Sequence, residues 1–118
     1  MTGKEIYEIA EGCLGVPYLS GGASLSGFDA AGLVYYCHKQ LGITVARYTD
    51  GYIQAGKGGN GTIGEVVCWP GHAGICDGNS HVIHANKITG KVQKDLIRDV
   101  NLMTGSSPIG YRILYSEE

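Results

Sequence analysis

The sequence has no apolar run close to the roughly 18–20 residues that a membrane-spanning helix requires, so we expect no membrane-inserted segment. The opening residues 1–5 also lack the apolar core of a secretion signal. Charged residues are scarce, at 17% of the chain, and the net charge is -2. Because no excess of positive charge is present, the sequence predicts neither a nucleic-acid partner nor attraction to an anionic membrane.

Closely spaced cysteines are absent as well. Cys13, Cys37, Cys68 and Cys76 do not form the C-x-x-C pairs of a zinc ribbon. Each lies within an apolar pattern, and a free cysteine behaves as a small hydrophobic residue. We therefore expect buried, reduced thiols, although an even number of cysteines also permits disulfides.

The composition is that of a folded, loop-rich domain. A chain of 118 residues with 43% hydrophobic residues can form one domain spanning residues 1–118. It contains 20 glycines, and its 8 tyrosines contrast with 1 phenylalanine. Both features suit a domain with irregular loops and a polar cleft lined by aromatic side chains.

The spacing of apolar residues changes along the chain. Helical spacing predicts one helix before Gly15 and a second from about Ala30 to Leu41, with Asp29 as its N-cap. A short helix is expected around 51–55. Beyond residue 65 the period is two, which predicts strands over 65–69, 72–76, 81–86, 91–94 and 109–115. This order predicts an α+β fold in which a central antiparallel β-sheet packs against N-terminal helices.

Two histidines flank a predicted hairpin turn at 77–79. With a three-residue loop, His72 and His84 would lie directly opposite, with Cβ atoms about 5 Å apart, so one imidazole could orient the other. His81 has the opposite parity and is expected to be exposed or structural. Cys76 shares the parity of His72, but no residue supplies a fourth ligand at the usual spacing. We therefore predict no metal and no other cofactor.

Position 30 begins the second predicted helix. The unsatisfied N–H groups and the dipole of a helix N-terminus favour an anion. A cysteine there would have a lowered pKa, and a backbone N–H could bind an oxyanion. The residue in this sequence is Ala30.

Several segments together resemble the NlpC family of papain-like cell-wall cysteine endopeptidases. The family pattern is Pro-Tyr with paired glycines, then Phe-Asp-Cys-Ser-Gly-Leu-Val, then His-Val-Gly, then a second histidine followed by alanine. The matching segments are Val16-Pro17-Tyr18 with Gly21-Gly22, the run from Gly27 to Val34, His72-Ala73-Gly74-Ile75, and Val82-Ile83-His84-Ala85. The resemblance extends from about residue 5 to residue 115.

The resemblance implies catalytic roles for four positions. Ala30 occupies the place of the nucleophilic cysteine, so the chain as written is expected to be inactive. His72 is the general base, and His84 holds it in the useful tautomer. The hydroxyl of Tyr18 is expected to contact the oxyanion or the substrate.

The resemblance also implies substrate contacts. Asp29 is expected to face the free amino group of the stem peptide, and Gly74 is a further substrate-binding position. Ala31 stands where the family has a serine that contacts substrate, so this part of the pocket is expected to differ.

The function implied is hydrolysis of peptidoglycan stem peptides at the γ-D-glutamyl-diaminopimelate or γ-D-glutamyl-lysine bond. An N-acetylmuramoyl-L-alanine amidase and a natural pseudoenzyme that binds stem peptides remain alternatives. The pseudoenzyme is disfavoured because a binding module does not need a general base. We expect a secreted or otherwise extracytoplasmic monomer, with stem peptides as its partners.

Overall fold

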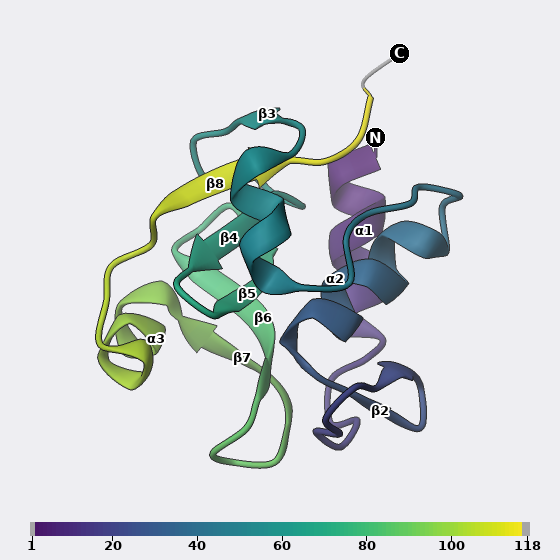
Figure 1. Cartoon of the computed structure of the whole chain (residues 1–118), viewed down its shortest axis with the longest axis vertical. Helices are drawn as coiled ribbons and strands as arrows, with labels where there is room; N and C mark the ends of the chain where they lie inside the picture. The colour runs from purple at the N-terminus through teal and green to yellow at the C-terminus, as the bar shows by residue number, and fades with distance from the viewer. Residues whose placement is uncertain (1, 117–118) are drawn as a thin grey trace.

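The computed structural model describes residues 2–116, and Figure 1 shows the course of the chain. The helices are α1 (Thr2–Glu11), α2 (Ala30–Lys39) and α3 (Ile97–Thr104), with a 3-10 helix, η1, over Thr49–Gln54. The strands are β1 (Ala23–Ser24), β2 (Gly27–Phe28), β3 (Lys57–Gly58), β4 (Val66–Trp69), β5 (His72–Cys76), β6 (His81–Asn86), β7 (Lys91–Leu96) and β8 (Gly110–Ile113).

The main sheet has six strands in the order β3-β8-β4-β5-β6-β7, and its neighbouring strands pair antiparallel. The strands from β4 to β7 follow one another along the chain, while the last strand returns to lie between β3 and β4. Helices α1 and α3 lie on opposite sides of these strands (Figure 1). This architecture confirms the predicted α+β fold with a central antiparallel sheet.

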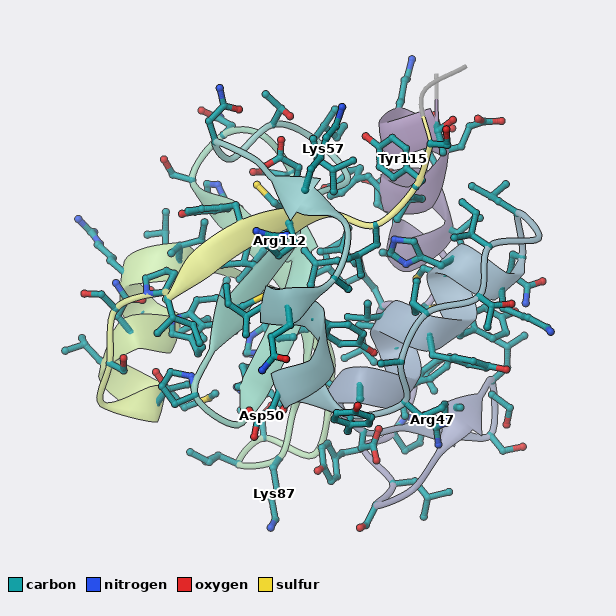
Figure 2. The ribbon with its side chains drawn as sticks, turned by 45° about the horizontal axis from the view of Figure 1, so that its top comes forward. Arg47, Asp50, Lys57, Lys87, Arg112 and Tyr115 are labelled. Carbon is teal, nitrogen blue, oxygen red and sulfur yellow. The ribbon has the colours of Figure 1, made fainter. Side chains whose placement is uncertain are left out.

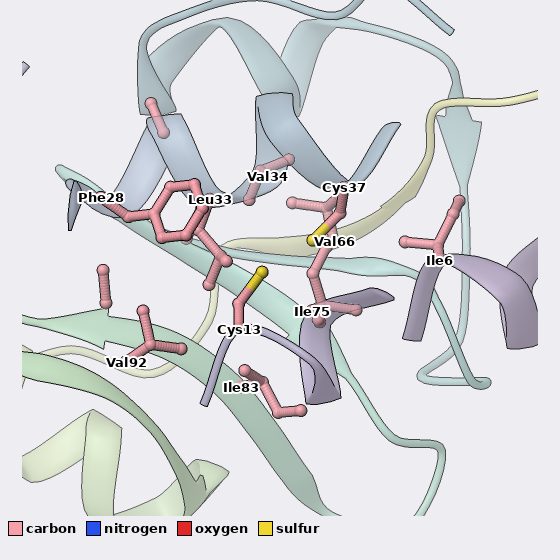
Figure 3. Packing of buried hydrophobic residues seen from close by; sticks show 14 of the residues in the cluster. Ile6, Cys13, Phe28, Leu33, Val34, Cys37, Val66, Ile75, Ile83 and Val92 are labelled. Atoms are coloured by element: carbon pink, nitrogen blue, oxygen red, sulfur yellow. The ribbon is translucent and has the colours of Figure 1, made fainter. Parts of the chain in front are cut away.

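Alternating side chains give the sheet two apolar faces. Ile75 and Ile83 pack with Leu33 and Val34 of α2 in the larger cluster, which Figure 3 shows from close by. On the other face, β4, β6 and α3 contribute to a smaller cluster that includes Trp69. The larger cluster fixes α2 against β5, and it thereby fixes the start of α2 relative to the start of that strand.

The start of α2 is defined by Asp29, as predicted. The backbone of Asp29 is extended, with φ -94° and ψ -178°, and its Oδ1 accepts a hydrogen bond of 2.6 Å from the N–H of Gly32. A side chain at position 32 would collide with the carbonyl oxygen of Gly22. Two glycines therefore allow the preceding loop to pass closely over the first turn of the helix.

The hairpin that joins β5 to β6 differs from the predicted one. Ile75 pairs with Ile83, so the residue opposite His84 is Gly74 and not His72. The predicted direct pairing of the two histidines was wrong. The carboxylate of Asp77 accepts hydrogen bonds from the N–H groups of Asn79 and His81, which places the turn one residue later than expected. This shift preserves parity, so both histidines remain on one face.

Other departures lie near the end of the chain. Strand β7 continues to Leu96, two residues beyond the predicted end, and it is followed by α3, which the sequence pattern did not predict. The short helix expected around 51–55 is a 3-10 helix that begins at Thr49. Among residues 2–116, no helix is long and apolar enough to cross a membrane.

The cysteines are all free and buried, as expected for reduced core thiols. Cys13 and Cys37 point toward one another inside the larger cluster (Figure 3). Their thiols interact by a hydrogen bond that, with burial, raises the pKa of Cys37. Cys37 is therefore a packing residue and not a reactive thiol.

Candidate active site

A cavity of about 360 Å³ lies where the start of α2 meets the start of β5. It brings together Ala30, His72 and Tyr18, which come from separate segments of the chain. The rest of the lining is formed by Pro70, Gly71, Ala85, Lys87, Ile88, Met103 and Thr104. Figure 2 shows Lys87 extending from the loop between β6 and β7. The cavity therefore joins three of the four positions for which sequence predicts a catalytic role.

A larger cavity, of about 670 Å³, lies beside the first turn of α3. Its lining includes Cys76, Arg98 and Tyr111, but none of the predicted site residues. Burial raises the pKa of the Cys76 thiol to about 11, so this thiol is not a nucleophile at neutral pH. The smaller cavity is therefore the candidate active site.

His72, His84 and Asp95 form a continuous hydrogen-bonded series. Nε2 of His72 lies 2.8 Å from Nδ1 of His84, and Nε2 of His84 lies 2.7 Å from Oδ2 of Asp95. The two imidazole rings are nearly perpendicular, at 87°. His72 is 9% exposed at the cavity, whereas His84 is fully buried behind it. Only His72 of this pair can therefore reach a molecule in the cavity.

Burial determines the charge of this series. Burial, with a smaller contribution from the neighbouring His84, lowers the pKa of His72 to about 4. Burial also lowers the pKa of His84, against the opposing effect of Asp95. For Asp95, burial raises the pKa, but hydrogen bonds from His84 and Gln93 outweigh it and the net shift is downward. At neutral pH the series therefore holds two neutral imidazoles and one carboxylate.

The ring of His72 is supported from β4. The centroids of the Trp69 and His72 rings are 5.7 Å apart. The indole N–H of Trp69 donates a 2.7 Å hydrogen bond to Oδ1 of Asn101, so α3 fixes the indole that packs beside His72. This contact limits how far the His72 ring can turn.

Tyr18 reaches the cavity because its segment is attached to β7. The N–H of Tyr18 donates to the carbonyl of Gly90 at 2.8 Å, and the N–H of Val92 donates to the carbonyl of Val16 at 2.9 Å. Burial raises the pKa of Tyr18, and the nearby Asp29 carboxylate adds to the shift. The Tyr18 hydroxyl therefore stays protonated at neutral pH and can donate a hydrogen bond into the cavity.

The predicted substrate-binding residues Asp29, Ala31 and Gly74 are not among the residues that line the cavity. Both carboxylate oxygens of Asp29 accept backbone hydrogen bonds, from Gly32 at 2.6 Å and from Gly21 at 2.9 Å. Ala31 is buried, with 6% exposure. Substrate contacts by these three residues remain predictions.

Gly74 has a clear packing role. A Cβ built at this position would lie 2.6 Å from Cγ2 of Val82, 2.8 Å from the carbonyl of Ile83 and 3.0 Å from Cβ of His84. The missing side chain therefore allows β5 and β6 to approach closely where the two histidines meet.

Asp95 was missed by the sequence interpretation, which ended the strand at residue 94. Residues 81–86 and 91–96 are separated by a four-residue loop, and a symmetric pairing across it places His84 opposite Gln93. Asp95 shares the parity of Gln93 and therefore the face of His84. Among the described residues, no cluster of three or more His, Cys, Asp or Glu side chains is arranged to hold a metal ion.

The sequence profile of the NlpC/P60 family matches residues 15–105. A gamma-D-glutamyl-L-lysine dipeptidyl-peptidase of Bacillus subtilis (strain 168) is 39% identical over 57 residues, which are 48% of this chain and 19% of that protein. The probable peptidoglycan endopeptidase LytE of the same organism is 32% identical over 83 residues, which are 64% of this chain and 25% of that protein. The chain thus spans a quarter or less of these curated relatives.

Solved structures share the fold. The NlpC/p60 domain of the peptidoglycan hydrolase SagA superposes with a TM-score of 0.82 and 26% identity, covering 94% of this chain and 97% of that domain. The peptidoglycan hydrolase RipB from Mycobacterium tuberculosis has a TM-score of 0.81 and 25% identity, covering 98% of this chain and 66% of RipB. The papain-like fold implied by the sequence resemblance is therefore confirmed, and this chain belongs to the NlpC/P60 family.

Proposed function

We propose that this chain is the catalytic domain of a cysteine peptidase that hydrolyses peptidoglycan stem peptides, with Ala30 at the position of its nucleophile. One observation carries the proposal: Ala30, the first residue of α2, lines the same cavity as His72, and His72 is backed by His84. A helix N-terminus and a neutral imidazole are together the environment that a thiol nucleophile requires.

With cysteine at position 30, the residues of the cavity would act in a defined order. His72 accepts the thiol proton, and the thiolate attacks the amide carbonyl of the substrate. The N–H groups at the start of α2 and the Tyr18 hydroxyl donate hydrogen bonds to the oxyanion. His72 then protonates the departing amine, a thioester remains, and a water deprotonated by His72 hydrolyses it.

Alanine at position 30 removes the attacking atom and leaves the rest of this arrangement in place. The chain as written therefore binds a stem peptide without cleaving it. The intact series from His72 to Asp95 supports the interpretation that a cysteine has been replaced, since a binding module has no use for a base with its own orienting partners.

The test is to express Ala30→Cys and to follow its products from purified muropeptides by mass spectrometry. Ala30→Ser is the matched control, because it has nearly the same size and no thiol. We expect cleavage by the cysteine variant alone. A correctly folded Ala30→Cys protein that cleaves nothing would leave the pseudoenzyme as the better description.

For the bond cleaved, we propose the one that follows γ-D-glutamate, toward diaminopimelate or lysine. The name of the Bacillus subtilis dipeptidyl-peptidase supports this choice. Each carboxylate oxygen of Asp29 accepts one capping hydrogen bond, from Gly21 or Gly32, and keeps a second lone pair that could accept from the free ammonium of the stem peptide. Comparing L-Ala-γ-D-Glu-diaminopimelate with its N-acetylated form tests this: equal rates would remove the amine site. Release of muramyl-lactate would instead identify an amidase.

The partner and the location follow from the same proposal. The substrate is a component of the cell wall, so the domain would act outside the cytoplasm, as a monomer. Sedimentation of the purified chain with and without muropeptides tests the monomeric state.

A further inference from the structure

We propose that Asp95 is a positioning residue that sets the tautomers of both histidines and so leaves Nδ1 of His72 free to accept a proton. The catalytic consequence rests on the proposed peptidase function, whereas the tautomers themselves can be measured in the chain as it stands. The hydrogen bonds run from Asp95, on the edge strand β7, inward to His84 and His72.

The carboxylate of Asp95 determines which nitrogen of His84 carries a hydrogen. Oδ2 of Asp95 lies 2.7 Å from Nε2 of His84, and the Asp95 side chain is 27% exposed. An ionised carboxylate can only accept hydrogen bonds. His84 must therefore carry a hydrogen on Nε2 and donate it to Asp95.

The tautomer of His84 in turn determines the tautomer of His72. His84 is fully buried and neutral, so a hydrogen on its Nε2 leaves a lone pair on its Nδ1. That lone pair faces Nε2 of His72 at 2.8 Å, and His72 must donate there. Since His72 is neutral too, its Nδ1 is left as the unprotonated nitrogen, which is the form that a general base requires.

A second arrangement of the hydrogens would place the hydrogen of each imidazole on Nδ1. Without an acceptor beside Nε2 of His84, the bond between the imidazoles can also run in the opposite direction. His84 would then donate through Nδ1, and His72 would carry its hydrogen on Nδ1, where it could not accept the proton of a thiol. Asp95 excludes this second arrangement.

The position of Asp95 is itself fixed by neighbours on the same hairpin. Nε2 of Gln93 donates to Oδ2 of Asp95 at 2.7 Å, and Oγ1 of Thr89 donates to Oε1 of Gln93 at 2.5 Å. In the register of β6 and β7, His84 lies opposite Gln93 and Val82 lies opposite Asp95. Asp95 is therefore the diagonal neighbour of His84, within reach of a ring that extends along the face.

The first experiment measures the tautomers directly in the Ala30 chain. Two-bond ¹⁵N–¹H correlation spectra distinguish an imidazole with its hydrogen on Nε2 from one with it on Nδ1. We expect both His72 and His84 to be fixed with the hydrogen on Nε2. In Asp95→Leu, which has a similar size and no acceptor, we expect each ring to become a mixture of both tautomers. A hydrogen on Nδ1 of His84 in the parent chain, or an unchanged spectrum in Asp95→Leu, would overturn the proposal.

The second experiment measures rates in the Ala30→Cys background. We expect Asp95→Leu to lower kcat by about 10–100-fold with little change in KM, a loss similar to that caused by removing a residue that orients a histidine at a metal site. Asp95→Asn keeps an oxygen acceptor, which the N–H of Gln93 favours in the same place, and it should recover most of the rate. Asp99→Leu removes an exposed carboxylate from α3 and should have no effect on kcat.

These outcomes separate the two proposals. An inactive Ala30→Cys parent would contradict the peptidase function and leave the spectra to decide the role of Asp95. If Asp95→Asn were as slow as Asp95→Leu while both remained folded by near-UV circular dichroism, an acceptor at this position would not be what His72 requires. The positioning role would then be wrong.

Discussion

His38, near the end of α2, and His84, in β6, are both fully buried, and burial lowers the pKa of each. Their hydrogen bonds differ. Nδ1 of His38 lies 2.8 Å from the carbonyl of Val34, so it must be a donor, and its Nε2 has no partner among the described residues. Both nitrogens of His84 have partners, and one of these partners is a second imidazole.

The difference shows what burial alone does not establish. His38 has the burial and the lowered pKa that are often taken to mark a functional histidine. It lacks a connection to a group that reaches a cavity, whereas His84 is connected to one through His72. A directed series of hydrogen bonds that ends at a cavity is the more specific sign of function.

The largest expected effect is on catalysis. In the Ala30→Cys chain, His72→Ala should lower kcat by about 10²–10⁴-fold, because a general base takes part in the proton transfers. His84→Gln should leave a measurable remainder, since an amide can replace part of the orienting bond. His38→Leu should leave kcat unchanged. Turnover of muropeptides by variants with matched circular dichroism spectra checks this order, and a His72→Ala enzyme as fast as its parent would show that another group is the base.

The second effect is on acid stability. The pKa of His72 falls from an ordinary 6.5 to about 4 in the folded chain. Between these values the unfolded chain binds a proton that the folded chain does not, so stability decreases as the pH falls from about 6.5 to about 4. The contribution of His72 is roughly 3 kcal/mol, and the lowered pKa values of His84 and His38 act in the same direction.

Urea unfolding at pH 7 and at pH 4.5 measures this loss. His72→Gln, which keeps a donor for His84 and cannot titrate, should show a shallower dependence on pH. If the free energy of unfolding of His72→Gln declined as steeply as that of the parent, His72 would not be the group responsible.

The smallest effect is on the stability of the α2 end. His38→Leu removes an unpartnered nitrogen from the interior, and the carbonyl of Val34 keeps its place in the helix. We expect the free energy of unfolding to stay unchanged or to rise by up to about 1 kcal/mol. Denaturant titration at pH 7 measures it. A loss of several kcal/mol would mean that His38 has a bonding partner, and the contrast with His84 would disappear.

Sequence reasoning located the elements of the site better than it located their contacts. The helix start at Ala30 and the strands that carry His72 and His84 were all predicted, because capping and period-two patterns are local signals. The register between the two histidine strands was wrong by two positions. It depends on the carboxylate of Asp77, which binds backbone N–H groups and moves the turn, and this choice is not visible in apolar spacing.

Sequence analysis did not predict helix α3 or the role of Asp95, for different reasons. The N-cap of α3 is Leu96, whose side chain makes no capping hydrogen bond, and the one side chain of this helix that is fully buried is that of Val100. Such a helix gives a weak sequence signal; Gly105, with φ 77°, was the available sign of its end. Extending the predicted strand by two residues, to Leu96, would have placed Asp95 on the same face as His84.

In the proposed mechanism, the nucleophile and the base come from separate parts of the chain. The series from His72 to Asp95 is contained in one uninterrupted β-meander, β5 to β7, whereas position 30 belongs to a helix contributed from earlier in the chain. The position of the nucleophile and the hydrogen-bonded series that supports the base therefore belong to different structural units. In the proposed mechanism, a single codon would switch hydrolysis off or on while the hydrogen-bonded series from His72 to Asp95 stays assembled.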